Sequence, residues 1–218
     1  MRVLTHLCCG PCGIMTLKRL LALGHEPTGF FFNPNIHPLA EYLRRRAGAA
    51  QVCLRLGLPA IFADALPRQE QTWGASPAGT AGEASGLIPC AAESSGLPPA
   101  VDPRPWLRLM SGREAERCPL CWRIRLAETV KIARSKGFEG FSSSLLYSRH
   151  QDHQSIRQTA ENLAASSGLT FVYEDFRGFW REGIEISKAW GIYRQQYCGC
   201  LYSEYDRYAR DGAKAWGD

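Results

Sequence analysis

The first third of the chain alternates short apolar runs with segments that repeat apolar residues at helical spacing. The runs at 2–7, 29–32 and 58–63 are short and bounded by turn residues, which predicts buried strands. The segments between them, 12–23 and 38–56, have the periodicity of helices, and each ends before a glycine. This alternation of strands and helices favours a parallel sheet with right-handed crossovers.

The alternation stops between about 67 and 105, where Gly, Ala, Ser and Pro are frequent and large apolar side chains are scarce. Such a composition adds little to a hydrophobic core, so it predicts a flexible surface insertion. A chain of 218 residues is enough for one domain with a proper core. The whole chain, 1–218, is therefore interpreted as a single domain that carries this insertion.

Periodic segments return at Trp106. Helices are predicted over 118–136 and 151–166, and strands over 138–146 and 169–173. The remaining C-terminal part is rich in aromatic and basic residues and is expected to be helical. The predicted fold class is α/β, with a parallel-sheet core and an aromatic, basic C-terminal part.

Composition indicates a globular protein, because 45% of the residues are apolar and 22% are charged. No apolar run approaches the roughly 20 residues of a membrane-spanning helix, and no signal-peptide core precedes Cys8. These observations predict a cytoplasmic protein with no membrane partner. The net charge of +5 suits an anionic partner such as RNA, although many proteins without such a partner carry a similar excess.

The nine cysteines change this picture, because an odd number in a chain expected to be cytoplasmic argues against a disulfide scaffold. Cys53 and Cys90 stand alone and are interpreted as bystanders. The other seven form three clusters, each at the end of a predicted strand or the start of a helix: Cys8, Cys9 and Cys12; Cys118 and Cys121; Cys198 and Cys200. Ligands gather at the carboxyl ends of strands in an open parallel sheet, so we expect the three clusters to meet at one site.

Thiolates bind soft metal ions, and four of them complete a zinc site or an iron–sulfur cluster. Seven exceed one tetrahedral site, which favours a cluster together with a second metal or an open reactive position. A structural zinc site and a redox dithiol are the alternatives, and the spacing does not decide which metal is bound.

Other motifs are weaker. The chain has neither a P-loop nor a Gly-x-Gly-x-x-Gly motif. His150 and His153 flank Asp152 at a predicted helix start, where capping is a simpler role than metal binding. Asp175 follows a predicted strand, where a carboxylate can bind metal or donate a proton; a surface salt bridge is the simpler alternative. The aromatic and basic residues between 176 and 208 suit base stacking and phosphate contact, or the packing of a C-terminal helix.

Taken together, the motifs resemble those of the cobalamin-independent epoxyqueuosine reductases, the QueH family. The shared segments cover about 3–205 apart from the interrupted stretch, and they are Leu7-Cys8-Cys9-Gly10-Pro11-Cys12, Phe32-Asn33-Pro34-Asn35-Ile36-His37-Pro38 with Glu41-Tyr42 and Arg45, Arg117-Cys118 through Cys121 to Arg125-Leu126, Ser144-Leu145-Leu146 with Ser148, Asp175-Phe176-Arg177, Gly183, Ser187, and Tyr193-Arg194-Gln195-Gln196-Tyr197-Cys198-Gly199-Cys200. The chain departs from the family in its longer insertion and in Arg149-His150, which replaces a usual Pro-Tyr.

The resemblance implies a metalloenzyme with a [4Fe–4S] cluster and an additional mononuclear iron. It implies reduction of the epoxide of epoxyqueuosine in tRNA to the cyclopentene of queuosine, with electrons from a low-potential donor. As a hypothesis, Cys118 and Cys121 bind the cluster with thiolates of the first motif, and Cys198 and Cys200 bind the second iron with one of them. The two sets are interchangeable.

Further site residues are expected from the same motifs. The predicted catalytic residues are Asp175, Tyr193 and Arg194, and the predicted substrate-binding residues are Asn33, Asn35, Tyr42, Arg45 and Arg177. A zinc-stabilised tRNA-binding module without redox catalysis is the alternative function. An iron–sulfur enzyme that thiolates tRNA is disfavoured, because the chain lacks a nucleotide-binding loop.

Overall fold

The structure is a computed structural model that describes residues 1–66 and 101–215, with side chains described as far as residue 209. Most of the predicted insertion, 67–100, and with it Cys90, lies outside the described residues. The last residues assigned to the insertion include the start of a helix, α3 (Arg104–Met110). Trp106 anchors α3, because its side chain is only 1% exposed.

A five-stranded parallel sheet forms the centre of the molecule. Its strands are β1 (Arg2–His6), β2 (Glu26–Phe31), β3 (Ala60–Phe62), β4 (Gly140–Ser143) and β5 (Thr170–Phe171). The order across the sheet is β3-β2-β1-β4-β5, so β1 lies in the middle. The observed sheet confirms the predicted fold class.

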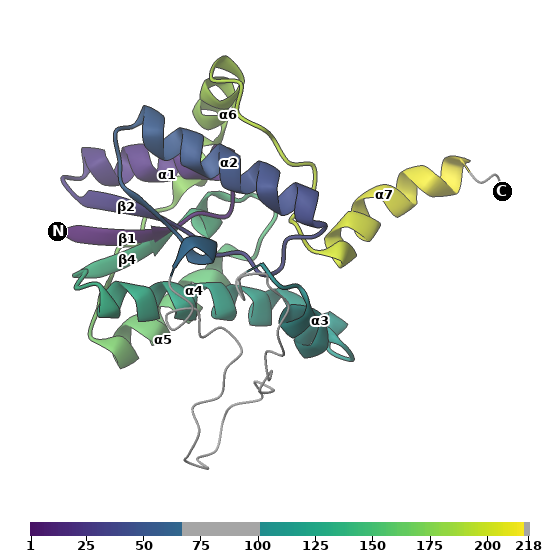
Figure 1. Cartoon of the computed structure of the whole chain (residues 1–218), viewed down its shortest axis with the longest axis horizontal. Coiled ribbons are helices and arrows are strands. Elements are labelled where there is room, and N and C mark those ends of the chain that lie inside the picture. The colour runs from purple at the N-terminus through teal and green to yellow at the C-terminus, as the bar shows by residue number, and fades with distance from the viewer. Residues whose placement is uncertain (67–100, 216–218) are drawn as a thin grey trace, which may run out of the picture.

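Helices cover both faces of the sheet (Figure 1). On one face lie α1 (Gly10–Ala22), α2 (Leu39–Arg55) and α6 (Trp180–Ala189), and on the other lie α4 (Arg117–Ser135) and α5 (His153–Ser167). The C-terminal α7 (Leu201–Ala215) extends away from the sheet (Figure 1). None of the helices within 1–66 and 101–215 combines the length and the apolar character that crossing a bilayer requires.

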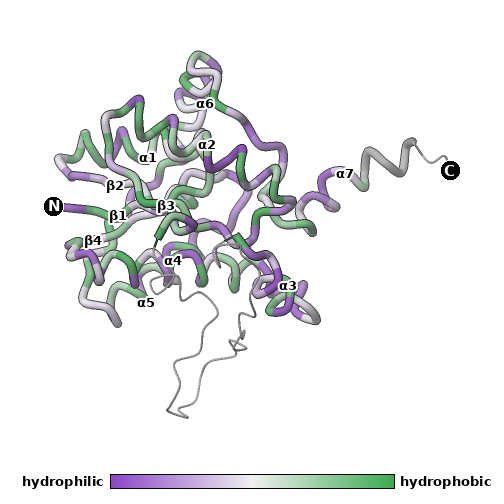
Figure 2. Tube along the Cα trace, in the orientation of Figure 1, coloured by the Kyte–Doolittle hydropathy of each residue, from purple (hydrophilic) through white to green (hydrophobic). Residues whose placement is uncertain are grey.

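The central strand is buried on both faces, which explains its nearly continuous apolar sequence. Val3 packs into one hydrophobic cluster with α1 and α2, whereas Leu4 packs into a second cluster with Trp106 of α3. Hydrophobic positions accordingly concentrate along the strands at the centre of the molecule (Figure 2).

Two predicted strands are shorter than expected. The prediction over 138–146 divides into β4 and a 3₁₀ turn at Ser144–Tyr147, because the Ser143 hydroxyl accepts a hydrogen bond from the Leu145 amide and caps that turn. The prediction over 169–173 contains only the two residues of β5, which lie at the sheet edge.

The sheet has a topological switch point at β1. From β1 the chain crosses to β2 on one side, and it later returns to β4 on the other. In open α/β sheets the crevice at such a point, beyond the carboxyl ends of the strands, is where ligands bind. The segment that leaves β1 at this point contains the first cysteine motif.

Candidate metal centre

Three of the predicted cysteine ligands follow β1 directly. Cys8 and Cys9 lie between β1 and α1, and Cys12 lies in the first turn of α1. The Cys9 side chain accepts a hydrogen bond from the Cys12 amide at 3.4 Å, so Cys9 is the N-cap of α1. The three ligand atoms all lie within 4.8 Å of one another, which allows one metal centre to bind all three. We call these residues the triad; within 1–66 and 101–215 no other three potential metal ligands are as closely grouped.

The glycine inside the first motif is required by close packing. A Cβ atom at Gly10 would lie 2.6 Å from Cγ2 of Ile192 and 2.8 Å from the Gly48 carbonyl oxygen. The start of α1 therefore contacts both α2 and the segment that follows α6. This contact fixes the triad relative to the C-terminal third of the chain.

Hydrogen bonds among the three sulfurs give them unequal pKa values. The Cys12 and Cys9 side chains, with help from the Ser144 hydroxyl, hold the pKa of Cys8 well below its usual value. Burial raises the pKa of Cys9, and hydrogen bonding to Cys8 and Cys9 raises the pKa of Cys12. The three thiols therefore differ in how readily they lose a proton, and metal binding would release the protons that they hold.

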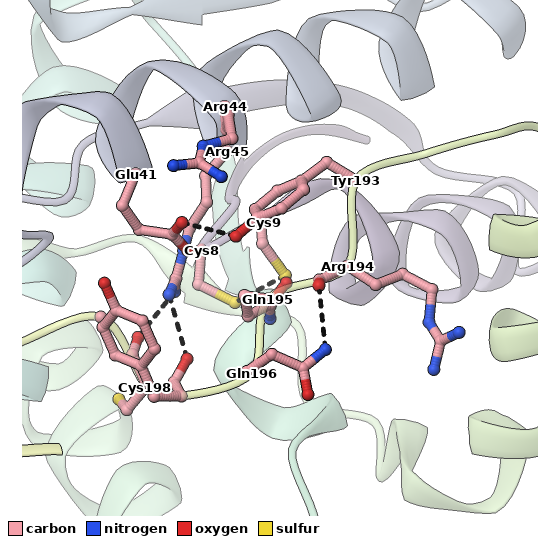
Figure 3. A network of polar contacts seen from close by, with 12 residues as sticks. Cys8, Cys9, Glu41, Arg44, Arg45, Tyr193, Arg194, Gln195, Gln196 and Cys198 are labelled. Atoms are coloured by element: carbon pink, nitrogen blue, oxygen red, sulfur yellow. Dashed lines mark hydrogen bonds and ion pairs between the residues drawn. The ribbon is translucent and has the colours of Figure 1, made fainter. Parts of the chain in front are cut away.

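Two side chains from distant segments contact the triad. Ser144 accepts a hydrogen bond from the Cys8 amide at 2.9 Å and donates one to Cys8 Sγ at 3.3 Å. Gln195 Nε2 donates to Cys9 Sγ at 2.9 Å and lies 3.8 Å from Cys12 Sγ (Figure 3). Sequence reasoning did not assign either residue to the site. The only available signal was that both residues lie in segments that carry the family resemblance.

The other four clustered cysteines come from two segments, and we call them the second group. Cys118 and Cys121 lie in the first five residues of α4, and Cys198 and Cys200 precede α7. Burial raises the pKa of Cys118 and of Cys121, and the charge of Cys200 adds to both shifts. Cys200 therefore interacts electrostatically with both cysteines of α4.

A buried ion pair holds the third cysteine motif in place (Figure 3). Arg45, on α2 and 2% exposed, donates from Nε to Glu41 Oε1 at 2.7 Å. Its Nη1 and Nη2 donate to the carbonyl oxygens of Cys198 at 2.7 Å and Tyr197 at 3.0 Å. Tyr193 completes the network by donating its hydroxyl to Glu41 Oε2 at 2.5 Å. We call Glu41, Arg45 and Tyr193 the latch.

Two residues of the latch, Arg45 and Tyr193, were predicted from the sequence to act on the substrate. The polar donors of Arg45 and the hydroxyl of Tyr193 already have protein partners, so their predicted roles in substrate binding and catalysis stay predictions. Tyr42 is buried in the core beside Phe31, with ring centroids 5.3 Å apart. Arg194 is exposed, and its side chain points away from the cysteines (Figure 3).

Two buried amides lie near the cysteine motifs with unused hydrogen-bonding capacity. Asn33 donates to the Leu7 carbonyl oxygen at 2.9 Å, but its Oδ1 has no partner. Both polar side-chain atoms of Asn35 are buried without partners, and Asn35 packs beside Gly199, between Cys198 and Cys200. Their predicted role in substrate binding stays a prediction that this geometry permits.

Comparison with known proteins identifies the family. A sequence model described as "Epoxyqueuosine reductase QueH" matches residues 3–92 and 97–206. The chain belongs to the QueH family of epoxyqueuosine reductases. It is similar to proteins named epoxyqueuosine reductase QueH from Dehalococcoides mccartyi (29% identity, covering 98% of each chain) and Haemophilus influenzae (33% identity, 94% of this chain and 72% of that one). A third, from Thermotoga maritima, is 28% identical and covers 94% of this chain and 91% of that one.

Membership of the QueH family confirms the resemblance inferred from the motifs and favours a redox enzyme over a zinc-stabilised binding module. Both matched segments include cysteines, because residues 3–92 contain the triad and residues 97–206 contain the second group. The matched segments also contain Asp175 and Arg177.

In this QueH-family chain Asp175 and Arg177 pair with each other. Asp175 accepts hydrogen bonds from Arg177 Nε at 2.8 Å and Nη2 at 2.6 Å, and the pair is about half exposed. The Arg177 guanidinium lowers the pKa of Asp175 to about 2, so the carboxyl is ionised at neutral pH. A role for Asp175 as proton donor, or for Arg177 in substrate binding, would require this pair to separate, and both roles stay predictions.

The start of α5 is capped by the aspartate between the two histidines. Asp152 caps the helix by accepting a hydrogen bond from the Ser155 amide at 3.0 Å. His153 is partly buried, and its Nε2 lies 3.2 Å from the Tyr173 hydroxyl, whereas His150 is exposed. Cys53 also agrees with its interpretation as a bystander, because it is buried among apolar residues of α2 and burial raises its pKa to about 11.

Proposed function

We propose that this chain acts as an epoxyqueuosine reductase on tRNA, where it removes the epoxide oxygen of epoxyqueuosine to give queuosine. The observation that carries the proposal is the triad of cysteine sulfurs at the switch point of the sheet in a member of the QueH family. The triad supplies three ligands from one segment, and the latch brings the third motif to the same edge of the sheet.

The residues fit a metal cofactor. Seven thiols provide soft ligands, and Arg125, fully buried on α4, has no acidic partner among the described residues, although charge on Cys121, Cys198 and Cys8 raises its pKa. Metal-bound thiolates would supply the negative charge that this cation lacks. We propose that the four cysteines of the second group bind a [4Fe–4S] cluster, and that the triad binds the additional iron.

This division revises the hypothesis drawn from the sequence, which combined the first motif with each of the other two. The distances within the triad support keeping its three sulfurs on one centre. Four thiolates are the full ligand set of a [4Fe–4S] cluster. Three leave a coordination position open, which suits a metal that takes part in the reaction.

The reaction needs two electrons and two protons for each epoxide, and the oxygen leaves as water. The cofactor, when bound, supplies the electrons. The chain's own residues would position that cofactor. Ser144 and Gln195 orient the triad sulfurs, and Arg45 binds the carbonyl oxygens of Tyr197 and Cys198. Asn35, with both polar atoms unused beside the third motif, is the proposed contact to a polar group of the substrate.

The proposed partners are tRNA and a low-potential electron donor. The net charge of +5 and the exposed Arg194 and Tyr205 suit contact with phosphates and bases. Chemistry on a base in a folded RNA requires that base to leave its stack, so the substrate nucleoside is expected to enter the site extruded.

The proposal is tested on protein purified without oxygen, by iron and acid-labile sulfide analysis, an absorption spectrum and turnover of tRNA that carries epoxyqueuosine. About four sulfides and four to five irons per chain, a sulfur-to-iron band near 400 nm (an approximate position), and formation of queuosine are expected. Stoichiometric zinc without sulfide after anaerobic reconstitution, and no turnover, would contradict the proposal and support the tRNA-binding module.

Two cysteine variants sharpen this test. Cys121→Ala is expected to lose the sulfide, whereas Cys12→Ala is expected to keep most of it and lose about one iron, and both are expected to lose turnover. Cys53→Ala, which removes a buried cysteine outside the motifs, is the control and should keep both the metals and the activity. Loss of sulfide in Cys12→Ala with retention in Cys121→Ala would reverse the proposed division.

A further inference from the structure

Arg125 is a buried cation without the partners that such a group requires. It lies on α4, and its side chain is 1% exposed. Its Nε donates to the Cys121 carbonyl oxygen at 3.3 Å, one helical turn earlier, while Nη2 is buried without a hydrogen-bond partner. It forms no ion pair within the described part of the chain. An isolated buried charge of this kind is strongly unfavourable.

Arg125 lies one helical turn from Cys121 and contacts its carbonyl oxygen. Charge on Cys121, Cys198, Cys8 and Cys200 favours the protonated guanidinium, and these residues come from all three cysteine motifs.

No carboxylate pairs with this cation within the described part of the chain, and its Nη2 has no hydrogen-bond partner there. Cysteines bound to metal are thiolates, so metal binding would place negative charge beside the buried guanidinium.

We propose that Arg125 is a positioning residue whose buried charge compensates the metal-bound thiolates and raises the reduction potential of the cofactor. The inference rests on the proposed function, because it requires the iron–sulfur centre. Each added electron makes the centre more negative, and a fixed cation nearby stabilises the reduced state more than the oxidised state. Net charge and hydrogen bonding are established determinants of such potentials.

The inference predicts effects of opposite sign in two forms of the protein. Arg125→Met keeps an unbranched apolar side chain and removes the charge. In the metal-free protein this substitution removes an uncompensated buried cation, so the melting temperature is expected to be equal to or higher than that of the wild type. In the reconstituted protein the same substitution removes the counter-charge, so the melting temperature is expected to fall below that of the wild type.

The experiment measures melting temperature with and without cofactor, iron and sulfide content, and the midpoint potential for four proteins: wild type, Arg125→Met, Arg125→Lys and Arg123→Met. Arg123 is an exposed residue of α4 two positions away, so its substitution controls for a change in net charge. We expect Arg125→Met to show at least a tenfold loss of reduction by a fixed one-electron donor, a shift of about 59 mV to more negative potential. Arg125→Lys should recover most of that shift, and Arg123→Met should show little change.

Two results would overturn the inference. One is an unchanged midpoint potential in Arg125→Met with full iron and sulfide content. The other is an equal fall in melting temperature in the metal-free and the reconstituted forms, which indicates a packing role alone. Failure of the proposed function would be recognised separately, because the wild-type protein itself would take up no iron and sulfide; that result would remove the inference as well.

Discussion

Arg45 and Arg125 lie on helices that cover opposite faces of one sheet, and each is no more than 2% exposed. Arg45 has an acidic partner and two carbonyl acceptors at 2.7 to 3.0 Å. Arg125 has one carbonyl acceptor at 3.3 Å and an unpartnered Nη2. The two arginines are therefore equally buried, but the positive charge of Arg45 is much better balanced by protein groups than that of Arg125.

The difference distinguishes a buried arginine with a structural role, Arg45, from one whose charge would be balanced by a bound metal centre, Arg125. A buried charge whose partners are all protein groups is compensated without a ligand, and removing one member leaves the other uncompensated in an apolar environment. A buried charge without an acidic partner can gain compensation when metal-bound thiolates form beside it. How well protein groups balance the guanidinium charge in the metal-free chain thus distinguishes the structural role from the metal-dependent role. Substitutions at and around Arg45 test this difference between Arg45 and Arg125.

The largest effect is expected for Arg45→Met, which leaves the Glu41 carboxylate buried and frees the carbonyl oxygens of Tyr197 and Cys198. The metal-free protein should lose about 3–5 kcal/mol of unfolding free energy in urea denaturation. Arg44→Met, an exposed neighbour on α2, is the matched control and should change stability little. Equal stability of the two variants would remove the proposed contrast with Arg125.

A smaller effect is expected for Glu41→Gln, which keeps an acceptor for Arg45 but removes the negative charge. It should cost about 2–3 kcal/mol, because it leaves Arg45 as poorly compensated as Arg125. Combined with Arg45→Met, it should cost clearly less than the sum of the single changes, since both act on one pair. Additive effects in this double-mutant cycle would show that the two residues are not coupled.

Tyr193→Phe tests the outer part of the latch. It removes the hydroxyl that donates to Glu41 at 2.5 Å and keeps the ring, so a loss of about 1–2 kcal/mol is expected in the same denaturation assay. Tyr205→Phe, at a residue that is 72% exposed, is the control. If Tyr193→Phe removes turnover while leaving stability unchanged, its predicted catalytic role is supported instead of the structural one.

The smallest effect is expected for Arg177→Gln. Arg177 has a bidentate acidic partner, as complete as that of Arg45, but the pair is exposed. Solvent screens such pairs, so the melting temperature should stay close to that of the wild type. A large fall in the melting temperature would show that the ion pair stabilises the protein at this site although it is exposed.

Periodicity of apolar residues was sufficient to predict the parallel sheet and the main helices, because these elements bury continuous faces. It could not locate the end of β4, since Ser143 stops that strand through a local cap that apolar patterning does not encode. Cysteine spacing likewise predicted a metal site, because thiolates are few and chemically distinctive.

The grouping of sulfurs and the latch could not be predicted. Gln195 contacts Cys9 across 186 positions of sequence, and Arg45 binds the Cys198 carbonyl oxygen across 153. Nothing local to either residue specifies its partner. Arg125 was visible as a motif residue, but its lack of an acidic partner is a property of the three-dimensional arrangement alone.

The anchoring of the third cysteine motif by a helix near the other end of the sequence has a consequence for biosynthesis. The ribosome adds the residues between Cys12 and Cys198 at about 5–20 per second, so the triad is exposed on the nascent chain for on the order of ten seconds or more before its counterpart exists. Maturation factors can therefore complete the site only after the third motif has been synthesised, and oxidants can reach the N-terminal thiols during that interval.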